Sequence, residues 1–242
     1  MTTIDLTKTV RDFAVELPEA TRVFEKLGID YCCGGDKTLR DACLASGVSP
    51  DKVVGLLEES RHEAADSDES INWNSAPLSD LAAYIVNKHH RFTREELLRL
   101  RELLAKVCSV HGENHAELHR LRIVFTGLQD ELTSHMLKEE QILFPYIQNL
   151  EFAIAHGKPA PRPLFGTVRN PIRMMIQEHD DAGQALRALR EASSNYRVPA
   201  DGCMSFHTLY QALEEFEKDL HQHIHLENNI LFPRAAELEE CS

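Results

Sequence analysis

Hydrophobic residues recur at intervals of three and four along most of the chain after residue 77, with polar residues between them. This period is that of an α-helix with one buried face. Runs of β-branched residues are short, and glycine and proline are thin inside the long segments. The pattern predicts four long helices, at about residues 78–110, 115–149, 171–194 and 203–238. Four amphipathic helices of similar length are typical of an all-α protein built as an up-and-down four-helix bundle.

The first sixty residues follow a different pattern, in which short apolar stretches alternate with turn residues. One helix is predicted from Pro18 to Leu27, ending at Gly28, and another from Pro50 to about Ser60. Residues 1–60 are therefore expected to form a small helical domain. Residues 61–76 are rich in acidic residues and serine and have no apolar period, so we expect a linker to a bundle domain at 77–242.

A sequence repeat divides the bundle into two halves. The frame His-x3-Glu-x2-Ile-Leu-Phe-Pro runs from His135 to Pro145 and occurs again 88 residues later, from His223 to Pro233. The helices before these frames also match, at an offset of 89 residues, so that His90 corresponds to His179. Self-similarity of this kind indicates duplicated structural units. The bundle is thus expected to consist of two copies of one helix pair.

The repeat separates residues that both copies keep from residues that only one copy has. The pairs kept are His90 with His179, His135 with His223, and Glu139 with Glu227. Four other polar positions are not duplicated: His89 aligns with Glu178, Glu140 with Asn228, His225 with Leu137, and His221 with Thr133. The repeat therefore singles out four histidines and two glutamates.

Helical spacing places these six residues on the inward faces of the bundle. In the second and fourth predicted helices the inward faces are Leu128, Leu132, His135, Glu139 and Ile142, and Phe216, Leu220, His223, Glu227 and Ile230. In the first and third they are Val86, His90, Thr93, Leu97 and Leu100, and Met175, His179, Ala182, Leu186 and Leu189. Four imidazoles and two carboxylates are thus expected to share one core.

Two ionised glutamates in an apolar core cost several kcal/mol each unless something compensates their charge. One interpretation is a set of buried His–Glu hydrogen-bonded pairs. A pair of metal ions explains all six groups together, and four imidazoles with two carboxylates suit iron better than manganese or a structural zinc. We expect Glu139 and Glu227 to bridge two irons that the four histidines terminate. Each iron then has room for an oxo or hydroxo bridge and one exogenous ligand, which is typical of reactive or ligand-capturing sites.

The overall composition narrows the class of protein. The chain has 26 basic and 39 acidic residues and a net charge of -13, which disfavours nucleic acid as a partner. The longest apolar run, Leu81 to Val86, is far shorter than the roughly 20 residues that a membrane span needs. Met1 to Val10 has neither a basic start nor an apolar stretch. The six cysteines are too scattered to suggest a disulfide framework, so we expect a reducing, cytoplasmic setting.

At these motifs the sequence resembles the hemerythrin-like domain, and more closely the bacterial di-iron proteins of iron-sulfur cluster repair. Members of that family join an N-terminal Asp-Tyr-Cys-Cys-Gly-Gly motif, found here at Asp30 to Gly35, to a bundle with the frames Ser-His-Met-x-Lys-Glu-Glu-Gln-Ile-Leu-Phe-Pro and His-x3-Glu-Asn-Asn-x-Leu-Phe-Pro. The resemblance covers essentially the whole chain. It implies a hemerythrin-like bundle with di-iron ligands at His90, His135, Glu139, His179, His223 and Glu227.

The resemblance also implies a function, namely recovery of iron-sulfur enzymes damaged by nitric oxide or peroxide. The expected partners are nitric oxide or oxygen as small ligands and iron-sulfur proteins as clients, and a homodimer is compatible with this interpretation. Repair would proceed by iron donation, by nitric oxide reduction at the paired irons, or by both. The alternative is a binder or sensor of nitric oxide or oxygen without turnover. Oxygen-carrying hemerythrins have one more histidine ligand, which argues against simple oxygen transport.

Several further residues are secondary candidates. Cys32 and Cys33 either pack in a turn or form a redox or iron-relay site, and as neighbours they do not easily form a relaxed disulfide. Glu140 is expected to lie just outside the metal ligands and to support them. We expect no catalytic residue beyond the di-iron centre itself. Surface or structural roles are expected for His111, His115 and His119, which stand four residues apart and have no counterparts in the repeat.

Overall fold

A computed structural model describes residues 4–65 and 71–241 of the chain. Within those residues the regular elements are all helical, apart from one isolated β-bridge between Thr9 and Thr38. The predicted all-α class is therefore confirmed. The chain divides into two compact units, one of Met1–Pro77 with Ile224–Pro233 and the other of Leu78–His223 with Arg234–Ser242.

The N-terminal part of the first unit is built from short helices with clear start and stop signals. Thr9 begins the first helix through a capping box, because its hydroxyl accepts from the backbone N–H of Asp12 while the Asp12 carboxylate accepts from the N–H of Thr9. Gly28 ends the second helix in the left-handed conformation, with φ 66°. The helices are α1 (Val10–Glu16), α2 (Ala20–Leu27), α3 (Leu39–Ala45) and α4 (Pro50–Ala65).

Helix α4 is longer than the sequence pattern predicts. It ends at Ala65, so residues 61–65 belong to the helix and not to the expected linker at 61–76. Arginine, glutamate and alanine favour a helix even without an apolar stripe, which explains why it continues past Ser60. Residues 66–70 of that expected linker lie outside the described part of the chain.

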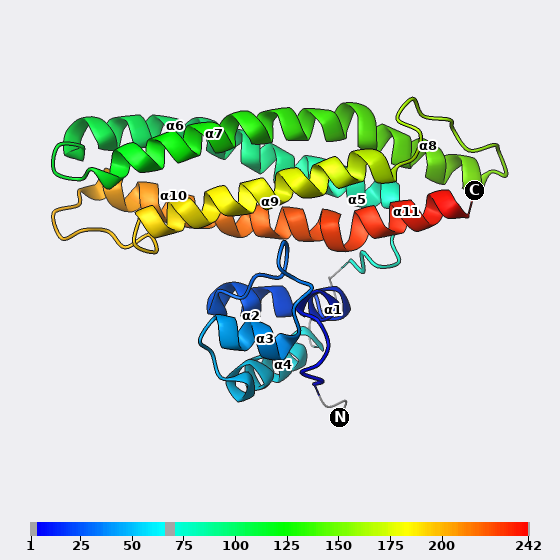
Figure 1. The fold of residues 1–242 in the computed structure, drawn as a ribbon, viewed down its shortest axis with the longest axis horizontal. Helices are drawn as coiled ribbons and strands as arrows, with labels where there is room; N and C mark the ends of the chain where they lie inside the picture. The colour runs from blue at the N-terminus through cyan, green and yellow to red at the C-terminus, as the bar shows by residue number, and fades with distance from the viewer. Residues whose placement is uncertain (1–3, 66–70, 242) are drawn as a thin grey trace. The chain divides into compact units, whose positions relative to one another are not determined.

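The helices after Pro77 form four long rods that alternate in direction (Figure 1). Helix α7 packs against α6 and α9, and α5 packs against α8. Within the described residues, no helix is both long and apolar enough to cross a bilayer. The rods are, in order, α5 (Leu78–Ile85), η1 (Val86–His90) and α6 (Arg91–His111); α7 (Glu117–Lys138), η2 (Glu139–Leu143) and α8 (Phe144–Ala155); α9 (Arg169–Ala192); and α10 (Met204–His225), η3 (Leu226–Leu231) and α11 (Phe232–Glu240).

Three of the four rods contain a π-helical turn, and at two of these turns, η1 and η2, the buried face differs from the predicted one. The expectation that Ile142 lies on the inward face is wrong, because its side chain is 51% exposed while that of Leu143 is 1% exposed. A π-helical turn closes its hydrogen bonds over five residues, so η2 adds one residue and moves the next inward position along by one. Just before η1, the apolar residue that is fully buried is likewise Ile85, the last residue of α5, and Val86 is only half-buried.

Candidate metal centre

The π-helical turns hold or adjoin most of the residues that the repeat singles out. His90 ends η1, Glu139 begins η2, and Glu227 lies in η3, one helical turn after His223. His179 differs, because it lies within the regular helix α9. Such turns are rare and are frequent at functional sites, where they redirect side chains.

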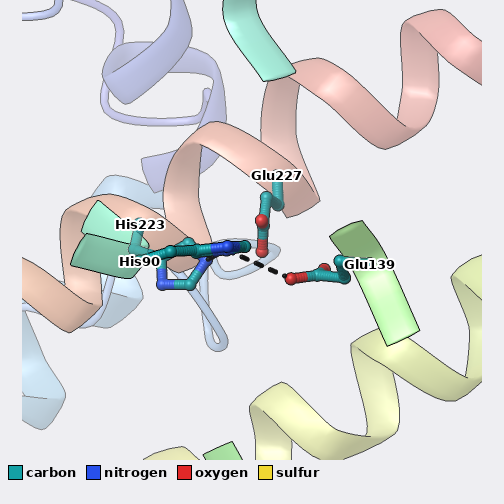
Figure 2. A group of neighbouring side chains, drawn as sticks. All are labelled: His90, Glu139, His223 and Glu227. Carbon is teal, nitrogen blue, oxygen red and sulfur yellow. Dashed lines mark hydrogen bonds and ion pairs between the residues drawn. The ribbon is translucent and has the colours of Figure 1, made fainter. Parts of the chain in front are cut away.

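The first group of converging side chains consists of His90, Glu139, His223 and Glu227, whose ligand atoms all lie within 4.8 Å of one another. Figure 2 shows both carboxylates reaching toward the two imidazole rings. Nε2 of His90 lies 3.2 Å from Nε2 of His223 and 3.4 Å from Oε2 of Glu139. The four side chains are buried, so they face one another and not the solvent.

The second group consists of His135, Glu139, His179 and Glu227, again with ligand atoms within 4.8 Å of one another. Nε2 of His135 lies 3.0 Å from Nε2 of His179 and 3.2 Å from Oε2 of Glu139. Glu139 and Glu227 belong to both groups. The structure therefore brings all six predicted residues together, as two histidine pairs that share two carboxylates.

These distances fit the coordination of metal ions. Two nitrogens that occupy adjacent positions on one octahedral ion, each about 2.1 Å from it, lie about 3.0 Å apart. The two observed imidazole pairs are separated by 3.2 and 3.0 Å. Both shared carboxylates have no solvent exposure, and a bound cation would supply the charge compensation that such burial demands. The donor set is thus suited to two metal ions held by common carboxylates.

Glu140 lies outside the ligand groups, as the sequence predicts for a supporting residue. Its Oε1 is 2.6 Å from Nδ1 of His90 and 2.6 Å from a guanidinium nitrogen of Arg94. Partial burial alone raises the pKa of Glu140, but the hydrogen bonds from His90 and Arg94 outweigh burial and lower the pKa below its ordinary value. An ionised carboxylate only accepts hydrogen bonds, so Nδ1 of His90 carries the proton and its Nε2 lone pair faces the centre.

Glu178 has the same role toward His135, and the sequence analysis missed it. Its Oε2 lies 2.9 Å from Nδ1 of His135, and its other oxygen is paired with Lys138. The hydrogen bond from His135 is the largest influence and lowers the pKa of Glu178, with Lys138 acting in the same direction against burial. The residue directly precedes His179 in the sequence. Because Glu178 has no duplicate, the repeat gave no signal for it.

His89 and His225 are buried histidines that stand outside both groups. Nδ1 of His89 lies 3.0 Å from Oδ1 of Asp219, and its ring stacks on that of His223 with centroids 5.9 Å apart. Burial lowers the pKa of His225 to about 4, so its ring is neutral. Neither residue is among the clusters suited to a metal within the described part of the chain. The absence of duplication thus separates them from the six converging residues.

The remaining sequence candidates lie elsewhere. Cys32 is buried and Cys33 is half-buried in the loop between α2 and α3, with their sulfur atoms 3.6 Å apart. His115 pairs with Glu117 and Asp201, and its ring lies edge-on to that of Phe206. His111 packs against the same phenylalanine, which is consistent with a structural role for this group.

Comparison with known proteins agrees with this architecture. Residues 81–235 match the Hemerythrin HHE cation binding domain, and residues 6–61 match a domain of unknown function, DUF542. The chain is 39% identical to the iron-sulfur cluster repair protein YtfE of Musicola paradisiaca, over 94% of this chain and 96% of that protein. It is 37% identical to that of Pectobacterium atrosepticum, over 93% and 94% of the two chains, and 36% identical to that of Yersinia pseudotuberculosis, over 92% and 93%. The chain therefore belongs to the family of iron-sulfur cluster repair proteins, with a metal-binding hemerythrin bundle.

Proposed function

We propose that this protein is a di-iron protein that repairs iron-sulfur clusters damaged by nitrosative or oxidative stress. The observation that carries the proposal is that both histidine pairs share Glu139 and Glu227. Nitrogen and carboxylate oxygen donors in this ratio suit iron. The relatives with the highest identity quoted above carry the name iron-sulfur cluster repair protein, and they match almost the full length of this chain.

The residues of the centre have two kinds of role, metal binding and support of the metal-binding histidines. Glu139 and Glu227, which belong to both groups, would be shared by two cations, and each histidine pair would bind one of them. Glu140 and Glu178 each fix the orientation and tautomer of one imidazole in a different pair. Two bound irons would supply a redox-active pair with an oxo or hydroxo bridge and positions for nitric oxide or oxygen.

Two routes to repair are compatible with these residues. In the first, iron is a cargo that the six side chains release to a damaged iron-sulfur protein. Release is favoured by acid, because the histidines bind metal only when neutral and the glutamates only when ionised. In the second, two nitric oxide molecules are reduced to one nitrous oxide and one water by two protons and by two electrons from an external donor, and the buried side chains keep bulk water away from the reacting site.

The first experiment replaces both shared carboxylates with leucine. We expect two irons per chain and the absorption of an oxo-bridged pair in the unaltered protein, and loss of both in the Glu139→Leu and Glu227→Leu double variant. Recovery of a nitric oxide-damaged iron-sulfur enzyme should be lost in parallel. Glu131→Gln is the matched control, since Glu131 lies on α7 but is exposed. A double variant that lacks iron and still restores the damaged enzyme would refute the proposal.

The second experiment separates turnover from binding alone. Nitric oxide is added anaerobically to the iron-loaded protein together with an electron donor, and the headspace gas is analysed. Catalytic formation of nitrous oxide supports the reductive route. A stable adduct that forms without turnover, in a protein that also fails to restore the damaged enzyme, supports the binder or sensor and contradicts repair.

A further inference from the structure

The loop between α2 and α3 contains a second cluster of metal-ligating groups. One carboxylate oxygen of Asp30 and the sulfur atoms of Cys32 and Cys33 all lie within 4.8 Å of one another. The sulfur atoms are 3.6 Å apart, and Oδ1 of Asp30 is 3.5 Å from Sγ of Cys32. Neither cysteine is part of a disulfide, which would need the two sulfurs about 2.05 Å apart.

The backbone of the loop is folded around this cluster. Oδ1 of Asp30 accepts the backbone N–H groups of Cys32 and Cys33, at 3.2 and 3.0 Å. A Cβ added at Gly34 would lie 3.1 Å from Oδ2 of Asp30, so glycine leaves the space that this carboxylate occupies. The two thiols and the carboxylate are therefore held in place by local structure.

The distances are compatible with tetrahedral coordination and not with linear coordination. Two sulfurs at about 2.3 Å from one ion lie about 3.8 Å apart when the angle between the bonds is tetrahedral, and about 4.6 Å apart when it is linear. A carboxylate oxygen at about 2.1 Å from the same tetrahedral ion lies about 3.6 Å from each sulfur. The observed separations of 3.6 and 3.5 Å agree with a tetrahedral ion and not with a linear two-sulfur ion.

We propose that Asp30, Cys32 and Cys33 form a separate binding site for a tetrahedral, sulfur-seeking divalent cation of the Zn²⁺ or Fe²⁺ type. Three protein ligands leave the fourth position for an exogenous ligand, which is the arrangement of an exchangeable site and not of a closed structural one. Asp30 is exposed and Cys33 is half-buried, so an ion can enter and leave from solvent. The site shares no residue with the six in the bundle.

Protons compete with metal ions for the two thiolates, so the pH determines how far the site is occupied. Thiolates are the species that bind metal, so binding displaces the thiol protons and strengthens as pH rises. This trend provides a readout that does not depend on any catalytic activity.

The test uses cobalt as the probe and full-length, reduced protein whose bundle centre has been loaded with iron. The bundle groups offer nitrogen and oxygen donors, so an absorption band from thiolate-to-cobalt charge transfer reports only on cysteine ligands. We expect one cobalt per chain, with that band and the visible bands of tetrahedral cobalt, and displacement of cobalt by added zinc. Absence of the charge-transfer band in the unaltered protein would overturn the proposal.

Substitutions of the proposed ligands test whether the cobalt ion is bound by Asp30, Cys32 and Cys33. Cys33→Ser, at a half-buried position, should weaken the charge-transfer band because it removes one of the two thiolate ligands. Asp30→Asn keeps an oxygen that can accept the two backbone N–H groups but removes the charged ligand, so it should weaken cobalt binding without unfolding the loop. Asp36→Asn, an exposed carboxylate in the same loop that pairs with Arg11, and Cys203→Ser are the matched controls.

Two outcomes separate this inference from the proposed function. The Glu139→Leu and Glu227→Leu double variant should keep the thiolate-to-cobalt band while it loses iron. Circular dichroism establishes that each variant remains folded. A band that persists unchanged in folded Cys33→Ser protein would contradict the assignment, whatever the fate of the iron in the bundle.

Discussion

The carboxylate of Glu178 on α9 lies 2.9 Å from Nδ1 of His135 on α7, across 43 residues of sequence. Since Lys138 pairs with the other oxygen, the carboxylate is held from both sides. The imidazole is thereby locked with its Nε2 lone pair toward Glu139 and His179. One histidine of each pair is supported in this manner, because Glu140 does the same for His90.

We expect Glu178→Leu to weaken metal binding by about ten- to a hundredfold, the range typical of lost support for a ligating histidine. The leucine cannot accept the Nδ1 proton, so His135 loses its preferred tautomer. Competition with a chelator measures the change. Asp181→Asn, an exposed position on the same helix, should leave affinity unchanged. Equal metal affinities for the Glu178 variant and the unaltered protein would show that Glu178 does not support metal binding.

Replacing Glu139 and Glu227 with leucine should stabilise the metal-free protein while it abolishes iron binding. Both carboxylates have no solvent exposure, and without cations their burial is costly. Replacing a complete buried ion pair by apolar groups of similar volume is often neutral or gains about 1–4 kcal/mol. Denaturant unfolding of both metal-free proteins checks this. A lower midpoint for the double variant would mean that hydrogen bonds alone already compensate these carboxylates.

Glu239 ties α11 to the start of α9, and its loss should be visible as a change in pH-dependent stability. Its carboxylate accepts hydrogen bonds from the hydroxyls of Tyr146 and Thr167 and from the backbone N–H of Val168. Burial alone raises the pKa of Glu239, but these bonds outweigh it and lower the pKa. We expect Glu239→Gln to lower the free energy of unfolding by about 1–3 kcal/mol at neutral pH.

The sign of the pH effect follows from that lowered pKa. The stabilisation is complete above the ordinary pKa of glutamate and is lost as the pH falls through the lower pKa of the folded state. The difference between the unaltered protein and Glu239→Gln should therefore shrink on acidification. Glu237→Gln, exposed on the same helix, is the control. A difference that stays constant down to the acid unfolding of the protein would exclude a charged contact.

Cys203 should react with disulfide reagents at neutral pH. The hydrogen bond with His111, followed by that from the backbone N–H of Phe206, lowers the pKa of Cys203 to about 7. Its thiolate fraction, and with it the reaction rate, should rise with a midpoint near that pH. His111→Leu should move the midpoint upward. Rates are measured with Cys33 and Cys241 changed to serine, and an identical midpoint in both proteins would disprove the role of His111.

The duplication made the centre of the bundle predictable from sequence. It isolated His90, His135, His179, His223 and the two glutamates, and the structure brings these residues together in two groups. Residues that have a role in only one half of the bundle cannot be identified from the repeat. Glu140 was predicted from its place beside Glu139; Glu178 lies beside His179 in the same manner, but only its contact with His135 identified it.

Helix geometry set the second limit on prediction. A regular period of 3.6 residues places Ile142 inward, and a π-helical turn places Leu143 there instead. Hydrophobic spacing does not reveal this choice, since both residues are apolar. The end of α4 was missed for a related reason, because residues that favour a helix continue it where no apolar stripe remains.

The π-helical turns also preserve a record of how the chain arose. η2 and η3 begin at or next to the equivalent glutamates Glu139 and Glu227, so the extra residue occupies the same place in both halves. The simplest history is an insertion in one ancestral helix pair, followed by duplication and fusion. η1 has no equivalent in α9, so the ancestral symmetry was later broken at His90 or at His179. The two halves have since diverged in backbone shape while keeping the same six side chains.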